Sequence, residues 1–486
     1  MHITKPANLL ALCLSASALV LTGCGGGGGS GGSPPPPTNS APQFTSPATA
    51  TIAENTAGAV LTLAASDANG DPVTFAISGG PEAGFFRVSG NQLQLAEALT
   101  LNYDAFNDSD RDNIYRLIVT ASDGRGASTS QNIAVTVTND REGIAVTRIL
   151  TGLGDVVGMA ATGVTSRELI VGMRDGTYVR FEGNRSANDT APAPIDFFGA
   201  PIPGLAMLDI SWGPANAGAF PGLVGMFASS TEVSLQRSPS GINAEATLAF
   251  GDGRSAVGAI FFTPGGEGLA ALGDAGGTLA QLDSPPRENG FGKLFRMEPG
   301  SGASLRSFDA NPIGRGLQAP GGFAMIRNAT FGDLVALADQ GAQSEHEFSL
   351  FPENQRQMNF GWPFFEGSIL RQTGAPSQLD VPSLTYPFGV GRFEGSGIVM
   401  GAAYTGTIPG LTDQFIFGDA SGAIWSIITA ALQPGLPRNA SNMELRSDDF
   451  MPDAGRIDGV VEILTDTTGV LYLLDRDGEV FRIDRS

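Results

Sequence analysis

The chain of 486 residues is longer than one hydrophobic core ordinarily serves, and its 67 glycines, 31 prolines and 16% charged residues favour an all-β protein rich in turns. Its formal net charge of −21 argues against a nucleic-acid partner, because an acidic surface repels phosphate, and leaves solubility and cation binding as the two interpretations. Two cysteines and two histidines are too few for a disulfide framework or for a zinc site built from several histidines.

The first segment has the features of an export signal. Lys5 supplies a positive charge, and the apolar run Leu9–Leu21 is too short to span a bilayer permanently. The sequence Leu21-Thr22-Gly23-Cys24 resembles the bacterial lipobox, which implies cleavage before Cys24 and lipidation of its thiol. We therefore expect a signal peptide over residues 1–23 and a lipid-anchored protein of the bacterial cell envelope. The alternative is an ordinary secretory signal with a chance cysteine.

Residues 24–40 have the composition of a tether. Residues 25–37 read GGGGGSGGSPPPP, in which the Gly/Ser part is a flexible coil and the proline part is an extended rod. A phosphate-binding loop is disfavoured, because no strand precedes the glycines and no helix follows them. Such a tether would hold the folded domains away from the membrane.

Residues 41–141 have the pattern of a small β-sandwich. Short alternating apolar runs lie between turn signals such as Asn69-Gly70 and Asp123-Gly124. The runs that we expect to be strands include 59–63, 73–77, 115–119 and 133–137. About 100 residues with roughly seven such strands is typical of a Greek-key sandwich.

The same segment resembles a cadherin repeat. The resemblance is carried by Ala53-Glu54-Asn55, Asp67–Asp71, Leu101–Asp104, Ala121–Gly124 and Val137–Asp140. It implies Ca²⁺ bound by oxygen ligands at the pole where the next domain begins. The candidate metal ligands are Glu54, Asp104 and Asp123, followed by Asp67, Asn69 and Asp71. The last three lack the distal glutamate of an EF-hand loop, so we reject that motif for them. The alternative is that these residues only form turns.

Residues 144–486 carry a degenerate repeat. Each unit has an apolar strand, a small or acidic turn and another strand, and the units lie about 60 residues apart. The six runs are 169–176, 222–227, 269–274, 334–339, 415–419 and 471–475. Because no amphipathic helical stretches separate them, the repeat predicts six four-stranded blades around a central channel rather than a parallel α/β fold.

Three segments of this domain resemble the glucose/sorbosone dehydrogenase family. They are Gly292–Met297, Asn359–Pro363 with Glu366-Gly367 after it, and Gly332–Leu334 leading to Asp339-Gln340-Gly341. The resemblance covers the whole of this domain and, together with the cadherin-like segment, implies an all-β chain in which a cadherin-like sandwich precedes a six-bladed β-propeller. It also implies the family's chemistry, in which pyrroloquinoline quinone (PQQ) and Ca²⁺ serve the oxidation of an aldose sugar.

Only some of the positions that this resemblance assigns to the site carry the residue type of the family. Asp274 and Gln340 match the catalytic set, and Arg456 matches one of two arginines near the quinone. Gly341 matches a residue whose backbone carbonyl would bind Ca²⁺, and Ala342 is a substitution that keeps such a carbonyl near the cofactor. The family's catalytic histidine corresponds to Ser255, which cannot accept the sugar proton without a neighbouring base.

Two further positions reduce the positive charge that a triply anionic quinone needs. The second arginine position holds Asp458, and an Arg-Asn-Pro triplet is replaced by Gln318-Ala319-Pro320. Each lost charge-assisted contact is worth about 1.5–3 kcal/mol, so quinone binding would weaken by several orders of magnitude. We therefore expect a decayed or repurposed active site.

The remaining residues of interest have ordinary structural interpretations. We expect His346 to be a loop or surface histidine rather than a catalytic one, and Trp362 and Trp425 to pack between blades rather than stack on sugars. The sequence thus favours an envelope lipoprotein with a dehydrogenase-like propeller whose activity is doubtful. The alternatives are a Ca²⁺-dependent adhesion or binding protein, with a sugar or protein ligand at the propeller face, and a purely structural envelope protein.

Overall fold

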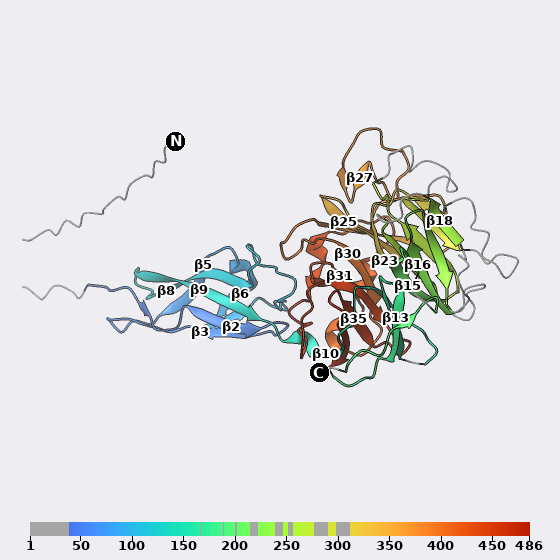
Figure 1. The fold of residues 1–486 in the computed structure, drawn as a ribbon. Coiled ribbons are helices and arrows are strands. Elements are labelled where there is room, and N and C mark those ends of the chain that lie inside the picture. The colour runs from blue at the N-terminus through green and yellow to red at the C-terminus, as the bar shows by residue number, and fades with distance from the viewer. Residues whose placement is uncertain are drawn as a thin grey trace, which may run out of the picture.

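The computed structural model describes residues 38–165, 167–187, 189–199, 202–213, 222–238, 246–250, 256–276, 290–297 and 312–486. The expected signal peptide, the expected lipidation residue Cys24, most of the tether and Ser255 lie outside these ranges. Figure 1 shows a slender β domain followed by a larger, rounded β domain. Across the described ranges, no helix combines the length and the apolar character that a bilayer span requires.

The first domain is a sandwich of two sheets. Its elements are β1 (Gln43–Phe44), β2 (Thr49–Ala53), β3 (Ala59–Thr62), β4 (Ala65–Ser66), β5 (Thr74–Gly79), η1 (Ala83–Phe85), β6 (Phe86–Ser89), β7 (Gln92–Leu95), β8 (Ile114–Ser122), β9 (Ser128–Thr138) and η2 (Arg141–Gly143). One sheet has the order β2-β9-β8-β5 and the other the order β3-β7-β6, while β1 and β4 form a separate pair. Strand β2 runs parallel to β9, and the other pairs of the two sheets are antiparallel.

The core of the sandwich is built from alternating residues of its strands. Along β8, Tyr115, Leu117 and Val119 are buried, whereas the residues between them are partly exposed. Leu93 from β7 and Val135 from β9 pack in the same core. Alternation of this kind places one face of each strand on the core, so the predicted β-sandwich is confirmed.

The second domain is made of sheets whose strands pair antiparallel, except that β22 runs parallel to β26. Its strands are β10 (Ile144–Leu150), β11 (Val156–Ala161), β12 (Glu168–Met173), β13 (Thr177–Glu182), β14 (Ile195–Asp196), β15 (Ala206–Gly213), β16 (Gly222–Ala228), β17 (Glu232–Arg237), β18 (Ala246–Phe250), β19 (Gly258–Phe262), β20 (Gly268–Leu272), β21 (Lys293–Met297), β22 (Gly314–Arg315), β23 (Pro320–Asn328), β24 (Gly332–Asp339), β25 (Glu345–Pro352), β26 (Met358–Asn359), β27 (Phe365–Glu366), β28 (Ile369–Leu370), β29 (Leu384–Pro387), β30 (Ile398–Ala403), β31 (Gln414–Asp419), β32 (Ile424–Ile428), β33 (Glu444–Leu445), β34 (Val460–Thr465), β35 (Leu471–Asp475) and β36 (Val480–Arg485). Short 3-10 helices η4 (Pro409–Leu411), η5 (Thr429–Ala431) and η6 (Ala440–Asn442) lie in its loops.

Within the described residues these strands form six blades. In chain order the blades are β11-β12-β13-β14, β15-β16-β17-β18, β19-β20-β21-β22-β26, β23-β24-β25-β29, β30-β31-β32-β33 and β34-β35-β36-β10, and β27 and β28 form a separate hairpin. The first strands β11, β15, β19, β23, β30 and β34 contact one another in sequence, and β34 returns to β11. Strand β10 from the start of the domain pairs with β36 from its end and so closes the ring. The predicted six-bladed β-propeller and the all-β fold class are confirmed.

The first strands enclose a central cavity of about 440 Å³. Asp209 from β15 and Glu462 from β34 line it, both at irregularities in the strand pairing. Asp209 accepts hydrogen bonds from the backbone N–H groups of Ile210 (2.7 Å) and Ile260 (2.8 Å), and thereby joins the second blade to the third. Gly158 of the first blade leaves room for this carboxylate, because a Cβ there would lie 2.4 Å from Asp209 Oδ1.

The two lumen carboxyls should make stability depend on pH. Burial raises the pKa of Asp209 to about 7, and burial together with Asp209 raises the pKa of Glu462 well above its usual value. A carboxyl whose pKa is raised in the folded state contributes stability that is complete below about pH 4 and is lost as the pH rises through the folded pKa.

We predict that Glu462→Gln flattens this dependence, because glutamine carries no charge next to Asp209. At pH 8 the variant should exceed the wild type in free energy of unfolding by about 1–2 kcal/mol, while at pH 5 the two should be close. Urea unfolding at both pH values measures the difference, with the exposed-site change Glu97→Gln as control. The expectation would be wrong if the free energy of unfolding changed by the same amount between pH 5 and pH 8 in the wild type and in Glu462→Gln.

Candidate functional site

The candidate catalytic residues follow equivalent strands of neighbouring blades. Asp274 follows β20, the second strand of the third blade, and Gln340, Gly341 and Ala342 follow β24, the second strand of the fourth. Equivalent strands end at the same end of a propeller, so both turns lie at one end of the ring. Arg456 precedes β34, the first strand of the sixth blade.

Asp274 is held in place by the third and fourth blades. Its carboxylate accepts a hydrogen bond from the indole Nε1 of Trp362 (2.7 Å), and its backbone N–H donates to the carbonyl of Gln318 (2.9 Å). Both Asp274 and Trp362 are half-buried. One carboxylate oxygen of Asp274 therefore serves a structural contact to Trp362, and the guanidinium of Arg371 lies 5.9 Å from the centre of the Trp362 ring.

Gln340 and Gly341 are constrained by their immediate surroundings. The side-chain amide of Gln340 donates to the carbonyl of Ile398 (3.3 Å), and its backbone N–H donates to the carbonyl of Ala319 (2.8 Å). Gly341 is packed so tightly that a Cβ would lie 1.8 Å from the carbonyl oxygen of Glu345. The structure thus places Asp274 and Gln340 on adjacent blades, but both side chains are already hydrogen-bonded to other residues of the propeller.

Buried acidic side chains lie next to these residues. Asp339 is buried, accepts the backbone N–H groups of Gln318 and Ala319, and has a pKa that burial raises to about 7. Glu347 is also buried, and burial raises its pKa well above the usual value.

Glu366 adds a third buried acid to this cluster. It accepts the backbone N–H groups of Gln343 and Ser344 (2.6 Å each) and forms an ion pair with Arg371. The described residues therefore place one arginine beside several acids.

PQQ does not fit the described residues at this end of the propeller. Among the described residues, those that line the small cavity between Gln340 and Trp362 include four carboxylic acids and no arginine or lysine. This lining therefore offers no cation to the three carboxylates of the quinone. Arg456, the cation expected to bind them, has an exposed side chain, and its backbone N–H donates to Glu479 on the sixth blade. In the described part of the chain no contact joins Arg456 to Asp274 or Gln340.

His346 is buried rather than exposed in a loop, which corrects the expectation from the sequence. It lies in β25, where its Nδ1 accepts the backbone N–H of Gly341 (3.2 Å) and its Nε2 lies 3.2 Å from the carbonyl oxygen of Gly395. Its ring packs against Tyr386 and Phe388, and burial lowers its pKa. The imidazole of His346 is therefore neutral and packs against its neighbours, because its buried surroundings disfavour the charged form.

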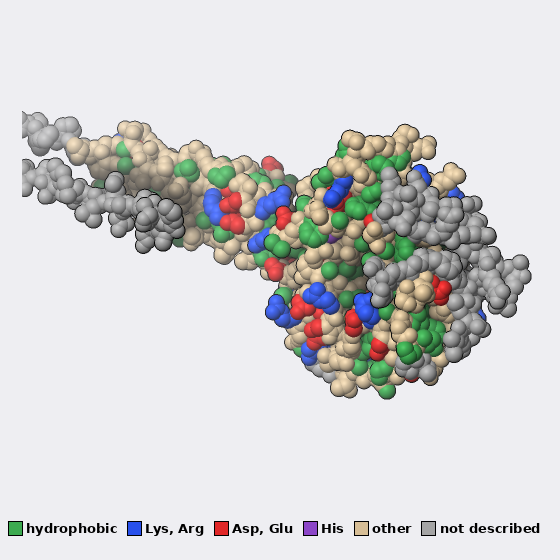
Figure 2. Space-filling model, turned by 45° about the horizontal axis from the view of Figure 1, so that its top comes forward, with side chains coloured by type: hydrophobic (Ala, Val, Ile, Leu, Met, Phe, Trp, Pro, Cys, Tyr) green, Lys and Arg blue, Asp and Glu red, His purple; other side chains and the backbone are tan. Residues whose placement is uncertain are grey.

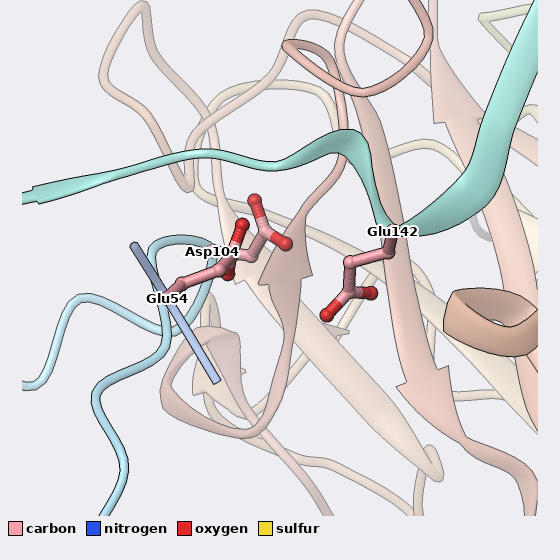
Figure 3. Close-up of side chains that lie close together, drawn as sticks. All are labelled: Glu54, Asp104 and Glu142. Atoms are coloured by element: carbon pink, nitrogen blue, oxygen red, sulfur yellow. The ribbon is translucent and has the colours of Figure 1, made fainter. Parts of the chain in front are cut away.

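A second polar centre lies at the junction of the two domains. Glu54 from the loop after β2, Asp104 from the loop before β8 and Glu142 from the linker each bring a carboxylate oxygen within 4.8 Å of the others. Figure 3 shows Glu54 and Asp104 close together and Glu142 reaching toward them from the linker. Glu54 accepts the backbone N–H groups of Tyr103 (2.9 Å) and Asp140 (3.1 Å), which fixes its carboxylate at this pole.

An arginine of the propeller enters this cluster. Arg446, whose side chain is 2% exposed, pairs through Nη1 with Asp104 (2.7 Å), Glu142 (2.6 Å) and Asp449 (3.1 Å), and through Nη2 with Glu444 (2.6 Å). One guanidinium thus contacts two carboxylates of the N-terminal part of the chain and two of the propeller. We call Glu54, Asp104, Glu142, Glu444, Arg446 and Asp449 the joint.

The joint holds more negative than positive charge. Its five carboxylates surround one guanidinium, and Oδ1 of the fully buried Asp104 has no hydrogen-bond partner. Burial raises the pKa of Asp104 to about 9 against the opposing effect of Arg446, and burial also raises the pKa values of Glu54 and Glu142. Such a cluster requires either protons or another cation to balance its charge.

Hydrogen bonds and ring contacts surround the joint. Asn102 donates to Glu444 (2.9 Å), and Asn139 donates to Asp449 (2.7 Å). Phe106 from the sandwich packs edge-on against Phe393 from the propeller, with 5.7 Å between ring centres. Figure 2 shows charged side chains of both signs on the surface around this junction. The two domains are therefore in close polar and apolar contact.

The structure separates the metal ligands that the sequence placed at one pole. Glu54 and Asp104 lie at the joint, but Asp123 follows β8, which carries it to the opposite end of the sandwich, where it accepts from Asn39 (2.6 Å). Asp67, Asn69 and Asp71 are also at that end: Asn69 accepts from the backbone of Ser40 (2.8 Å), and Asp71 pairs with Arg125 (3.0 Å). Among the described residues, Asp67, Asp71 and Asp123 do not form a compact carboxylate group like the one at the joint.

Sequence reasoning missed Glu142, Glu444, Arg446 and Asp449. Arg446 lies 342 positions from Asp104, and nothing in the spacing around it marks a site. Asn102 lies within the cadherin-like segment Leu101–Asp104, and its amide donates to Glu444. The residues of the joint are far apart in the sequence and come together only in the folded structure.

The comparisons with known proteins concern each domain separately. Residues 39–136 match the family model described as a bacterial Ig domain. No curated protein matches the chain. The resemblance to a cadherin repeat therefore rests on the motifs alone, while the Ig-type sandwich is shown.

Solved structures match the larger part of the chain. A glucose dehydrogenase superposes with a TM-score of 0.50 at 18% identity, covering 70% of this chain and 99% of that one. The soluble aldose sugar dehydrogenase from Escherichia coli in its apo form gives 0.48 at 15% identity (71% and 100% covered), and a Trichoderma reesei carbohydrate-active enzyme of family AA12 gives 0.48 at 13% (71% and 96%). The chain therefore combines a bacterial Ig-like domain with a propeller that has the fold of glucose dehydrogenase.

Proposed function

We propose that the protein is a lipid-anchored binding protein of the bacterial cell envelope. In this proposal Cys24 carries the anchor, the Gly/Pro tether and the Ig-like domain form a stalk, and the propeller presents a recognition face to a carbohydrate or protein ligand. The joint is the observation that carries the proposal. A buried network that fixes one domain on the other serves a protein that must hold a binding face in a set orientation.

We further propose that Ca²⁺ binds at the joint through Glu54, Asp104 and Glu142. Ca²⁺ prefers several oxygen ligands in a flexible arrangement, and these three carboxylates supply them within 4.8 Å of one another. The unpartnered Asp104 Oδ1 and the excess of carboxylates over guanidinium groups support this assignment. The bound ion would link the sandwich to the linker, and Asp104 and Glu142 pair in turn with Arg446 of the propeller.

An active dehydrogenase is the second candidate, and the fold is the observation that favours it. The chemistry of the site disfavours it, because the buried His346 cannot reach a substrate and the acidic surroundings of Asp274 and Gln340 do not suit a triply anionic quinone. Serine at position 255 supplies no base of suitable pKa.

One protein sample tests both candidates. We expect the purified full chain, incubated with PQQ and Ca²⁺, to show neither a bound-quinone spectrum nor dye reduction with aldoses, while an authentic glucose dehydrogenase is active in the same assay. On a glycan array in Ca²⁺ we expect the same chain to retain specific glycans. Quinone-dependent sugar oxidation would overturn the proposal and establish the second candidate.

A further inference from the structure

An acidic loop that is separate from the joint leads into β8. It reads Asn107-Asp108-Ser109-Asp110-Arg111-Asp112-Asn113, with an aspartate at every second position. Asp108, Asp110 and Asp112 each bring a carboxylate oxygen within 4.8 Å of the others. We call residues 107–114 the aspartate loop.

A buried and unpartnered oxygen distinguishes this loop from an ordinary acidic turn. Asp108 is 5% exposed, and its Oδ1 has no hydrogen-bond partner, while its Oδ2 accepts the backbone N–H of Asp112 (2.7 Å). The side-chain oxygen of the buried Asn113 is also unpartnered. Burying such oxygens without a partner costs free energy, which a bound cation would recover.

The spacing of the loop matches the first half of a Ca²⁺-binding loop. EF-hand loops take ligands from positions 1, 3 and 5 and from the backbone carbonyl at position 7, with a sharp turn at position 6. Here Asp108, Asp110 and Asp112 hold the three carboxylate positions, and Ile114 holds the carbonyl position. Asn113 at position 6 has φ 61°, the left-handed conformation that asparagine tolerates better than most residues.

A guanidinium nitrogen already lies where these ligands meet. Nη1 of Arg116 contacts both oxygens of Asp110 (3.2 and 3.1 Å), Oδ1 of Asp112 (3.2 Å) and the carbonyl oxygen of Ile114 (2.9 Å). Asp110, Asp112 and the carbonyl of Ile114 thus converge on one cationic atom. The Arg116 side chain is 41% exposed, so it can leave for solvent when a divalent ion takes its place.

We propose that the aspartate loop binds Ca²⁺ through Asp108, Asp110, Asp112 and the backbone carbonyl of Ile114. Position 12 of the pattern is Val119 rather than glutamate, so water completes the coordination. With three carboxylates and no bidentate glutamate, the site belongs to the weak class of extracellular Ca²⁺ sites, with Kd of about 10⁻⁴–10⁻³ M.

The position of the loop gives the ion a structural role. Phe106, just before the loop, is buried against the propeller residue Phe393, and the guanidinium of Arg111 lies 5.9 Å from the centre of the same Phe393 ring. An ion that orders the aspartate loop therefore also orders part of the domain contact. The site is independent of Ca²⁺ at the joint, because the two share no ligand.

Ca²⁺ titration calorimetry of the purified full chain tests the proposal, with Tb³⁺ luminescence excited through the nearby Tyr115 as a second readout. Asp110→Asn, at an exposed position, should weaken the low-affinity site by at least about tenfold. Arg116→Gln should tighten it several-fold, because the competing guanidinium is gone. Glu142→Gln should leave Ca²⁺ binding at the aspartate loop unchanged. A wrong assignment at the joint can therefore be told apart from a wrong assignment at the loop.

Two results would overturn the assignment. One is an Asp110→Asn chain with the same number of bound Ca²⁺ ions and the same affinities as the wild type. The other is an Arg116→Gln chain whose Ca²⁺ binding is unchanged or weaker. The second variant keeps the proposal falsifiable if the first fails to fold, which thermal unfolding in EGTA reveals.

Discussion

Replacing Arg446 by methionine should lower the free energy of unfolding, measured in EGTA, by about 3–5 kcal/mol. The substitution leaves Asp104, Asp449, Glu142 and Glu444 in a buried cluster with no cation among their direct contacts at the joint. Removing one partner of a buried ion pair costs far more than removing an exposed pair, because the remaining charges keep their desolvation penalty. Urea or thermal unfolding of the full chain measures the loss.

Arg476→Met is the matched control for this substitution. Arg476 is mostly exposed and lies 4.0 Å from the exposed Asp458, so its loss should change stability by less than about 0.5 kcal/mol. Arg446→Lys should recover only part of the wild-type stability, because a single ammonium cannot replace two guanidinium nitrogens that contact four carboxylates. An Arg446→Met chain as stable as the control would show that the joint does not hold the domains together.

Ca²⁺ should stabilise the chain through the joint. At a free Ca²⁺ concentration of about 100 times the Kd of that site, the free energy of unfolding should rise by about 2.7 kcal/mol relative to EGTA. Glu142→Gln should abolish most of this gain, since it removes one of three ligands and the one that comes from the linker. Thermal unfolding at matched ionic strength in Ca²⁺, Mg²⁺ and EGTA separates specific binding from charge screening.

Asp110→Asn serves as the control for the calcium effect at the joint. This substitution alters the aspartate loop, which is the low-affinity site. The variant should therefore keep the Ca²⁺-dependent rise in free energy of unfolding that comes from the joint and saturates at lower Ca²⁺ concentration. If Glu142→Gln gained as much stability from Ca²⁺ as the wild type does, the joint would not be a calcium site.

Much of the fold could be read from the sequence, because it follows from local periodicity. The six apolar runs of the repeat correspond to β12, β16, β20, β24, β31 and β35, which are the second strands of the six blades. These strands are almost fully buried, so an apolar run with a small or acidic turn after it is a reliable signal. The alternation along β8 likewise revealed the sandwich.

The sites were less predictable, because they depend on contacts between distant segments. The spacing around Asp274 and Gln340 placed them on adjacent blades, but it could not show that Trp362 and backbone carbonyls already engage them. The cadherin-like motifs located Glu54 and Asp104, yet the partner of Asp104 is an arginine 342 positions away. Asp123 was misplaced because the nine residues of β8 carry the chain to the other end of the sandwich.

We propose that Arg446 and Ca²⁺ at the joint hold the Ig-like domain and the propeller in one fixed orientation. Double electron–electron resonance between nitroxides on cysteines introduced at the exposed positions Thr62 and Thr231 tests it directly, one label on each domain. We expect a single narrow distance distribution for the wild type in Ca²⁺ and a broad one for Arg446→Met in EGTA. A broad wild-type distribution in Ca²⁺, or one that Arg446→Met in EGTA leaves unchanged, would contradict the account.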